Sequence, residues 1–317
     1  MEFPLVSIIC LCYNHEAFVD EALTSIEQLI YPNLEILVAD DFSSDRSREL
    51  LENWQRRKSD WKFFFNKENQ GNCKTFNQLL KISTGEFVLD FATDDVLESE
   101  ALQAWVNRLD RNPKAAFCYA DAWLFEKSRI QRHLYSISNK QKIRPEGKIL
   151  PFLFGPPFIC PPAVLFRRSA LHEIGGYNEN LAYEDWNVWL QLARKSEVVF
   201  HPQAVINYRT HSNSLSSSLF NKQNSRLIDS TLLILREVMA WDELKLIPEN
   251  VSHFLRYHLK LCAVLEFRSQ GLQFWQLLSS ISKPGKRDRL WLALIQSKIP
   301  VYWIFKWLSH KQKCKPI

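Results

Sequence analysis

Three pairs of adjacent acidic residues could carry chemistry in this chain: Asp40 and Asp41, Asp94 and Asp95, and Glu184 and Asp185. Each of the first two pairs follows an apolar run that is typical of a buried strand. In an open α/β sheet, ligands bind just beyond the carboxyl ends of the strands. Paired carboxylates at such a point can hold a divalent cation, and the cation can bind a phosphate. The alternative is a solvated turn whose acids favour the N-terminus of the next helix.

The elements that must position these acids alternate regularly over the first 97 residues. Apolar runs predict strands at 5–11, 34–39, 61–65 and 87–92. A helical pattern fills each of the three gaps between them, and a polar loop follows each strand. The order β-α-β-α-β-α-β predicts an α/β fold with a mostly parallel sheet covered by helices.

The following stretch mixes both kinds of element. Further strands are expected at 115–125, 163–166, 198–200 and 204–208, with helices at 101–112 and 184–194. Residues 127–148 lack periodicity and predict a long loop, and four prolines in 155–162 predict a rigid wall. Strand signals stop beyond Phe220. We therefore predict one domain of residues 1–218, with halves 1–97 and 98–218, and a helical C-terminal region of residues 219–317.

Composition places the chain among globular proteins, with 46% hydrophobic and 24% charged residues. The small net charge of +5 gives no indication of nucleic-acid binding. The seven cysteines are odd in number and irregularly spaced, and the first residues lack a basic, apolar signal sequence. We expect a reduced, cytoplasmic chain without disulfides. No run of 18 apolar residues occurs, so no transmembrane helix is expected.

Five segments resemble, in order, motifs of the family 2 inverting glycosyltransferases. Residues 6–16 resemble the opening strand and loop of that family, and residues 38–45 resemble its second-strand motif. Residues 93–95 resemble its metal-binding Asp-x-Asp equivalent. Residues 175–186 resemble its acceptor-side motif, and residues 208–211 its closing motif. Each segment alone is weakly specific, whereas five in the same order over residues 4–215 are strongly specific.

The resemblance implies a GT-A fold, in which a Rossmann-like nucleotide-binding half (1–97) is joined to an acceptor-binding half (98–218). It implies a hexosyltransferase-type enzyme that uses a nucleotide-sugar donor and Mn²⁺ or Mg²⁺. The expected donor is a UDP-sugar, and the expected acceptor is a glycan or lipid-linked glycan in surface polysaccharide synthesis. The Gln-x-x-Arg-Trp signature of processive synthases is absent, so we expect one sugar to be added per binding event.

Five residues take expected roles from their positions in these motifs. Tyr13 would stack on the base, and Asp41 would accept a hydrogen bond from it. Asp94 would lie by the ribose or diphosphate, and Asp95 would bind the metal. Asp185 would be the general base, because a carboxylate at a helix start can be fixed by the backbone while it faces a cleft. Capping of the following helices is the structural alternative for these acids.

Further residues could supplement this set. His211 could reach the metal or the diphosphate, or it could be a solvated loop histidine. Arg209 and Lys74 are candidates for diphosphate binding. Glu184 competes for the role of base. Trp186 could form a wall of the acceptor site or belong to the core.

Two positions depart from the family pattern. Phe76 stands where the family often has Arg, and Lys74 could replace that positive charge. Phe42 stands where the family usually has Gly after the paired acids. Two other functions fit the sequence less well. A nucleotidyltransferase would need a Gly-rich, basic loop at 12–16, which is absent. A non-catalytic sugar-nucleotide or glycan-binding scaffold would not need the general base and the metal ligand that the sequence retains.

The C-terminal segment 283–317 is basic and aromatic, with nine Lys and Arg residues against one Asp. Such a segment can lie on an anionic membrane surface, where a lipid-linked acceptor would be found. The alternatives are a helical cap on the catalytic domain or an oligomer contact. The sequence therefore predicts a cytoplasmic protein, with peripheral contact at the inner face of the membrane if this segment binds lipid.

Overall fold

The computed structural model describes residues 3–125, 133–138, 143–211 and 224–297, and its contacts divide the chain into two compact units. Unit 1 comprises Met1–Leu150, Pro157–Glu179 and Glu184–Ser214. Unit 2 comprises Pro151–Pro156, Asn180–Tyr183 and Leu215–Ile317. The boundary expected near residue 218 lies outside the described residues.

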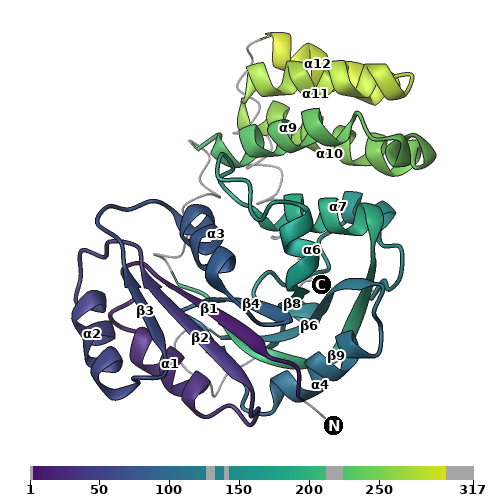
Figure 1. Ribbon diagram of the computed structural model, residues 1–317. Coiled ribbons are helices and arrows are strands. Elements are labelled where there is room, and N and C mark those ends of the chain that lie inside the picture. Colours follow the sequence, from purple (N-terminus) through teal and green to yellow (C-terminus); the bar gives the residue numbers. More distant parts are fainter. Residues whose placement is uncertain (1–2, 126–132, 139–142, 212–223, 298–317) are drawn as a thin grey trace, which may run out of the picture. The chain divides into compact units, whose positions relative to one another are not determined.

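Unit 1 is built on one mixed sheet, in which nine strands are described (Figure 1). The strands are β1 (Val6–Cys12), β2 (Leu34–Asp40), β3 (Lys62–Phe65), β4 (Phe87–Ala92), β5 (Val96–Leu97), β6 (Ala115–Phe125), β7 (His133–Leu134), β8 (Val164–Arg167) and β9 (Glu197–Arg209). Their order is β3-β2-β1-β4-β8-β6-β9-β5, with β7 paired to β6.

The first four strands pair in the order β3-β2-β1-β4, and they run parallel, as the alternation of strands and helices predicts. Cys12 pairs with Asp40, and Leu11 pairs with Ala92, so the carboxyl ends of β1, β2 and β4 meet at one edge. This register brings together the loops that carry the first two acid pairs. The other half is mixed, because β8 runs antiparallel to both β4 and β6, whereas β6 and β9 are parallel.

Helices cover both faces of this sheet (Figure 1). The helices of unit 1 are α1 (Val19–Glu27), α2 (Ser47–Arg57), α3 (Asn72–Ile82), α4 (Ala101–Asp110), α5 (Tyr135–Ser138), α6 (Arg168–Glu173) and α7 (Asp185–Lys195). Phe87, Leu89 and Phe91 of β4 pack into one core with buried residues of α1, α2 and α4. Since side chains alternate along a strand, Val88 and Asp90 face the opposite side of the sheet.

In the second half of unit 1, one expectation is wrong and another falls only partly on described residues. The short strands expected at 198–200 and 204–208 are one strand, β9, which pairs with β6 through several shifts of register. Where the register shifts, buried and exposed side chains no longer alternate along the strand, so the sequence shows a weaker strand pattern there. The described parts of the expected loop 127–148 include β7 and α5, while 126–132 and 139–142 lie outside the described residues.

Unit 2 is helical in its described part, as expected. Its elements are η1 (Leu150–Phe154), α9 (Arg226–Val238), η2 (Asp242–Leu246), α10 (Pro248–Leu265), α11 (Arg268–Ile281) and α12 (Lys286–Ser297). His258 of α10 is buried between Phe254 and the ring of Phe274 on α11. Among the described helices, none is both long and apolar enough to cross a membrane.

Candidate active site

The loops after β1 and β2 are joined by hydrogen bonds at the carboxyl edge of the sheet. The backbone N–H of Asp41 donates to the carbonyl of Cys12 at 2.9 Å, which extends the parallel pairing beyond the strands. The N–H of Asn14 donates to Oγ of Ser43 at 3.0 Å. Tyr13 lies between these two contacts in the sequence, and its side chain is 47% exposed. A large exposed ring on a fixed loop is available to stack on a planar ligand.

Asp41 is buried, and its carboxylate holds the loop that precedes α3. Oδ1 accepts hydrogen bonds from the Nδ2 of Asn66 and the N–H of Gln70, at 2.8 and 2.9 Å. Oδ2 accepts one from the N–H of Gly71 at 2.8 Å. Asp41, expected to contact the base, therefore also has a structural task in this protein. Oδ2 accepts this one hydrogen bond from the described residues and retains a lone pair for a second.

Phe42 occupies a backbone conformation that explains why glycine is usual at this position in the family it resembles. Its φ is +63°, in the left-handed region that disfavours side chains with a Cβ. Its ring is 51% exposed, so burial of the ring does little to offset that cost. The neighbouring contacts of Asp41 and Ser43 with the first loop hold the turn in place.

Phe42→Gly is therefore expected to unfold at higher denaturant concentration than Phe42→Ala. Both variants lose the ring, but only glycine relieves the left-handed backbone, at a gain of about 1 kcal/mol relative to alanine. Urea unfolding followed by circular dichroism measures the difference. If the alanine variant were as stable as the glycine variant, the left-handed turn would not be strained.

Asp94 lies in a cluster with two histidines. Its Oδ2 is 3.0 Å from Nε2 of His211 and 3.9 Å from Nε2 of His15. His15 is fixed through Nδ1, which lies 2.9 Å from Oγ1 of Thr93, and this hydroxyl donates to the carbonyl of Leu11. Burial lowers the pKa of His15. The side chains of Asp94, His211 and His15 are 13%, 16% and 17% exposed, so each keeps an accessible edge.

Asp95 is turned into the protein instead. It is 2% exposed, and its Oδ1 accepts a hydrogen bond from the N–H of Arg209 at 2.8 Å. Burial, and secondly the charge of Asp94, raise the pKa of its carboxyl. Arg209, expected to bind diphosphate, donates from Nε to the carbonyl of Asp94 and from Nη2 to Glu21. Both residues therefore fix the Asp94–Asp95 turn to the end of β9.

Asp94 and His211 form the donor pair that fits a divalent cation. Carboxylate oxygen suits Mg²⁺ and Mn²⁺, and an imidazole nitrogen beside it favours the transition metal of the two. Among the residues that the structure describes, no group of three acidic, histidine or cysteine side chains forms a complete metal site. Two protein ligands agree with the usual arrangement in which substrate phosphates and waters complete the coordination.

On the far side of β4, α3 is joined to the segment that resembles an acceptor-side motif. The amide of Asn77 accepts from the N–H of Tyr177 at 2.8 Å and donates to its carbonyl at 2.8 Å. Gly176 has φ of +81°, and a Cβ there would lie 2.4 Å from Oδ1 of Asn77. The buried ring of Phe76 stacks on Tyr177 with centroids 4.0 Å apart. This stacking accounts for the aromatic residue at 76.

Glu184 and Asp185 begin α7. Glu184 is 8% exposed and accepts hydrogen bonds from Nδ2 of Asn72 at 3.0 Å and from the thiol of Cys73 at 3.6 Å. Asp185 is the first helical residue and is half-buried. Burial raises the pKa of both carboxyls, and for Asp185 the charge of Glu184 adds to it. A carboxylate with raised proton affinity at a helix start has the properties of a general base.

Asp90 is a site residue that the motifs did not reveal. Its Oδ2 accepts a hydrogen bond from the hydroxyl of Tyr177 at 2.9 Å. Burial, followed by the charge of Glu184, raises the pKa of Asp90 to about 7, while the Tyr177 hydroxyl lowers it. The charge of Asp90 in turn raises the pKa of Asp185. In the sequence, only its position as a single acid within an apolar strand could have pointed to Asp90.

Residues 7–175, more than half of the chain, match the profile of the family described as Glycosyl transferase family 2. The chain belongs to glycosyl transferase family 2. Curated relatives of this family 2 protein include an uncharacterized glycosyltransferase from Haemophilus influenzae, 28% identical over 70% of this chain and 70% of the relative. A poly-beta-1,6-N-acetyl-D-glucosamine synthase from Staphylococcus epidermidis is 25% identical over 63% of this chain. The chain matches 48% of the length of that synthase.

Solved structures confirm the GT-A fold for this member of family 2. TarS 1-349 of S. aureus in complex with UDP-GlcNAc superposes with a TM-score of 0.69 at 20% identity, covering 98% of this chain and 92% of that one. Mannosyltransferase PcManGT from Pyrobaculum calidifontis, in complex with GDP-Man and Mn²⁺, gives 0.60 at 15% identity, covering 99% and 89%.

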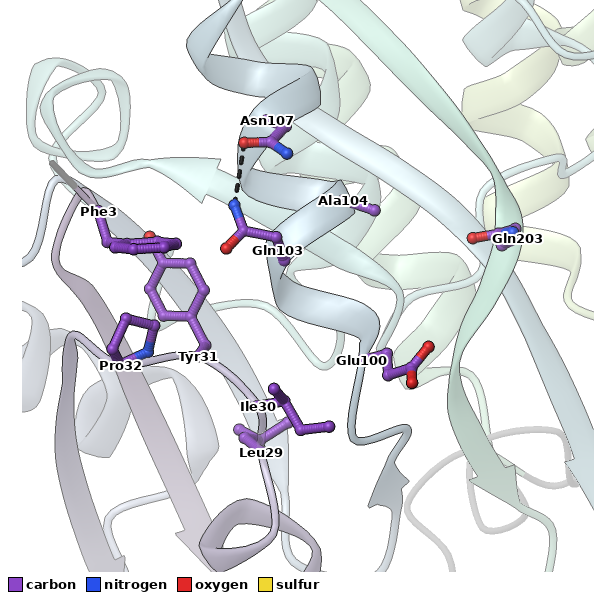
Figure 2. A pocket seen from close by; sticks show the side chains of 10 residues that line it. All are labelled: Phe3, Leu29, Ile30, Tyr31, Pro32, Glu100, Gln103, Ala104, Asn107 and Gln203. Atoms are coloured by element: carbon purple, nitrogen blue, oxygen red, sulfur yellow. Dashed lines mark hydrogen bonds between the residues drawn. The ribbon is translucent and has the colours of Figure 1, made fainter. Parts of the chain in front are cut away.

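Lys74 and Trp186 are the remaining expected site residues of this family 2 glycosyltransferase. Lys74 is exposed on the first turn of α3, and Trp186 is half-buried beside Asp185. A hollow of about 740 Å³ lies instead between residues 29–32 and α4, with Phe3 and Tyr31 on one side and Gln103 on the other (Figure 2). Phe3 precedes the amino end of β1, so this hollow is at the opposite end of the strand from Tyr13.

Proposed function

We propose that this family 2 glycosyltransferase is an inverting enzyme that transfers one sugar from a UDP-sugar to a glycan or lipid-linked acceptor. The observation that carries the proposal is the placing of two acidic clusters along β4. Asp94 with His211 lies beyond its carboxyl end, and Asp90 accepts a hydrogen bond from Tyr177, in the segment that leads to Glu184 and Asp185. Asp90 and Asp94 are four residues apart in the chain, so their Cα atoms lie at most about 13 Å from each other, which is the scale of a sugar attached to a diphosphate.

On the donor side, Tyr13 stacks on the base, and the loop held by Asp41 borders the nucleoside. Asp94 and His211 would hold the cation, for which we favour Mn²⁺. When bound, the cation neutralises the charge that develops on the leaving diphosphate. Arg209 and Asp95 keep the Asp94 carboxylate at the sheet edge through their contacts with the turn.

On the acceptor side, Asp185 takes the proton from the attacking hydroxyl. The hydroxyl oxygen forms a bond to the anomeric carbon from the face opposite the leaving group, so the configuration inverts. The bond from that carbon to the diphosphate oxygen breaks, and its electron pair leaves with the nucleoside diphosphate. Glu184 is held by Asn72 and Cys73. Within the described part of the chain, no side-chain donor fixes Asp185 in this way, so Asp185 is the better candidate for the base.

UDP-N-acetylglucosamine is the first donor to test, because the TarS neighbour binds it and a curated relative is named for a poly-N-acetylglucosamine product. A panel of UDP-, dTDP- and GDP-sugars is compared by thermal shift and slow donor hydrolysis, with and without Mn²⁺. We expect one donor class to stabilise the protein in a Mn²⁺-dependent manner. No response to any donor, or a response unchanged by EDTA, would contradict the proposal.

The membrane contact remains a proposal for the described part of 283–317. Helix α12 exposes Lys286, Arg287, Arg289 and the apolar Leu290, while residues 298–317 lie outside the described residues. We expect the protein to pellet with vesicles containing anionic phosphatidylglycerol at low salt, and the triple change of these three basic residues to Glu to weaken pelleting severalfold. Equal pelleting of both proteins would remove the basis for placing this enzyme at the inner membrane face by this helix.

A further inference from the structure

The ring of Phe18 contacts two residues at and just beyond the end of β9. Phe18 is the N-cap residue of α1, and its N–H donates to the carbonyl of His15 at 2.8 Å, which joins it to the loop after β1. Its half-buried ring has its centroid 4.9 Å from that of the His211 ring and 4.7 Å from Cζ of Arg209. One aromatic side chain therefore packs against both a proposed metal ligand and a buried arginine.

Arg209 does not depend on Phe18 alone. The ring of Phe125 also lies against its guanidinium, with the ring centroid 4.4 Å from Cζ. Its Nε donates to the carbonyl of Asp94, and its Nη2 donates to Glu21. Because loss of the Phe18 ring would leave these contacts in place, Arg209 gives no particular reason for an aromatic residue at position 18.

His211 is held by fewer contacts. Strand β9 ends at Arg209, two residues before it, so strand pairing does not fix this side chain. Within the described part of the chain, the ring of His211 contacts the Phe18 ring and Oδ2 of Asp94, which lies 3.0 Å from Nε2. Nε2 cannot be hydrogen-bonded to that carboxylate while it binds a cation, because both use the same position on the nitrogen. Of the two contacts, only the stacking on Phe18 is compatible with a bound cation.

We propose that Phe18 is a positioning residue for His211, whose imidazole its ring holds beside the Asp94 carboxylate for binding of a divalent cation. The inference rests on the proposed function, in which Asp94 and His211 are the metal ligands. A ligand side chain that is already fixed loses little freedom on binding, and residues that orient metal ligands contribute about 10- to 100-fold to metal affinity. Since Phe18 also closes the turn that begins at His15, it connects the metal ligand to the loop that carries Tyr13.

Isothermal titration with UDP tests this role in Phe18→Leu, which keeps an apolar side chain and removes the aromatic face. We expect the affinity for UDP in the presence of Mn²⁺ to fall about tenfold, because His211 is no longer held in place. The affinity without Mn²⁺ should stay within about twofold of wild type, since the ring acts on the metal ligand. Phe18→Tyr keeps the ring and should keep the Mn²⁺-dependent affinity.

Phe125→Leu is the matched control, because it removes the other ring from Arg209 and leaves the contacts of His211 unchanged. We expect urea unfolding to show a loss of stability in both leucine variants. The effect of Mn²⁺ on UDP affinity should change only in Phe18→Leu. An equal loss of Mn²⁺-dependent affinity in Phe125→Leu would assign the effect to general packing and overturn the inference.

The second readout is NMR relaxation of the His211 ring, which requires neither metal nor donor. In protein labelled with ¹³C at the histidine rings, the signal of His211 is assigned by its absence in His211→Gln. We expect the order parameter of this ring to fall by about 0.2 or more in Phe18→Leu, because the stacking that fixes it is lost. It should remain at the wild-type value in Phe18→Tyr and Phe125→Leu.

The two readouts separate the possible failures. A wild-type protein whose affinity for UDP does not depend on Mn²⁺ contradicts the proposed function, and the relaxation measurement still tests whether Phe18 fixes His211. A Phe18→Leu protein in which the His211 ring is as rigid as in wild type overturns the inference. So does one in which the ring is mobile but the Mn²⁺-dependent affinity is unchanged. If Phe18→Leu does not fold, Phe18→Met, which fills the space with a longer apolar side chain, is measured in the same two ways and against the same expectations.

Discussion

Replacing Asp185 with Asn is expected to lower the rate of sugar transfer about 10³-fold while leaving donor affinity within about twofold of wild type. The amide keeps the size of the carboxylate at the first position of α7 but cannot take a proton from the acceptor. The proposed donor site lies at the sheet edge of β1, β2 and β4, which this change does not touch. UDP release under saturating donor gives the rate, and isothermal titration with UDP and Mn²⁺ gives the affinity.

Glu184→Gln is the matched control for this prediction. The amide of Gln can still accept a hydrogen bond from Asn72, so the start of α7 is expected to remain in place. We expect a rate within about tenfold of wild type, since Glu184 influences the base only through its charge. A Glu184→Gln enzyme that is inactive beside an active Asp185→Asn enzyme would assign the base to Glu184.

The parallel half of the sheet could be predicted from the sequence because each of its strands is a continuous apolar run followed by a polar loop. Register then follows from burial, since a slip by one residue would turn the apolar side chains away from the core. The mixed half was less predictable. The path of β9 depends on irregular pairing with β6, more than seventy residues earlier in the sequence, and no local pattern encodes such pairing.

The candidate site shows the same division between local and distant information. The motifs identified the Asp94–Asp95 turn, but not which acid faces outward. That choice is made by a hydrogen bond from the backbone of Arg209, which is 114 residues away. The sequence does not point to Asp90 for the same reason, because Tyr177, which donates a hydrogen bond to it, and Glu184, whose charge raises its pKa, lie far along the chain.

Changing Asp94 to Ala is expected to abolish the Mn²⁺-dependent part of UDP binding, whereas Asp95→Ala is expected to act mainly on folding. Asp94 keeps an accessible carboxylate edge 3.0 Å from His211, and losing one of two protein ligands should weaken metal-dependent affinity by about 100-fold or more. Loss of Asp95 leaves the buried N–H of Arg209 without its acceptor, at a cost of about 1–3 kcal/mol in the free energy of unfolding.

The two variants are each other's control, because they remove the same group from adjacent residues of one turn. Isothermal titration of UDP with and without Mn²⁺ measures the first effect, and urea unfolding measures the second. The opposite outcome, a stable Asp95→Ala protein that no longer responds to Mn²⁺, would return the metal to Asp95, where the sequence motif alone had placed it. In that case the buried carboxylate of Asp95 would have to give up its hydrogen bond with the backbone N–H of Arg209 and bind the cation instead. The turn would then have to open when the donor binds.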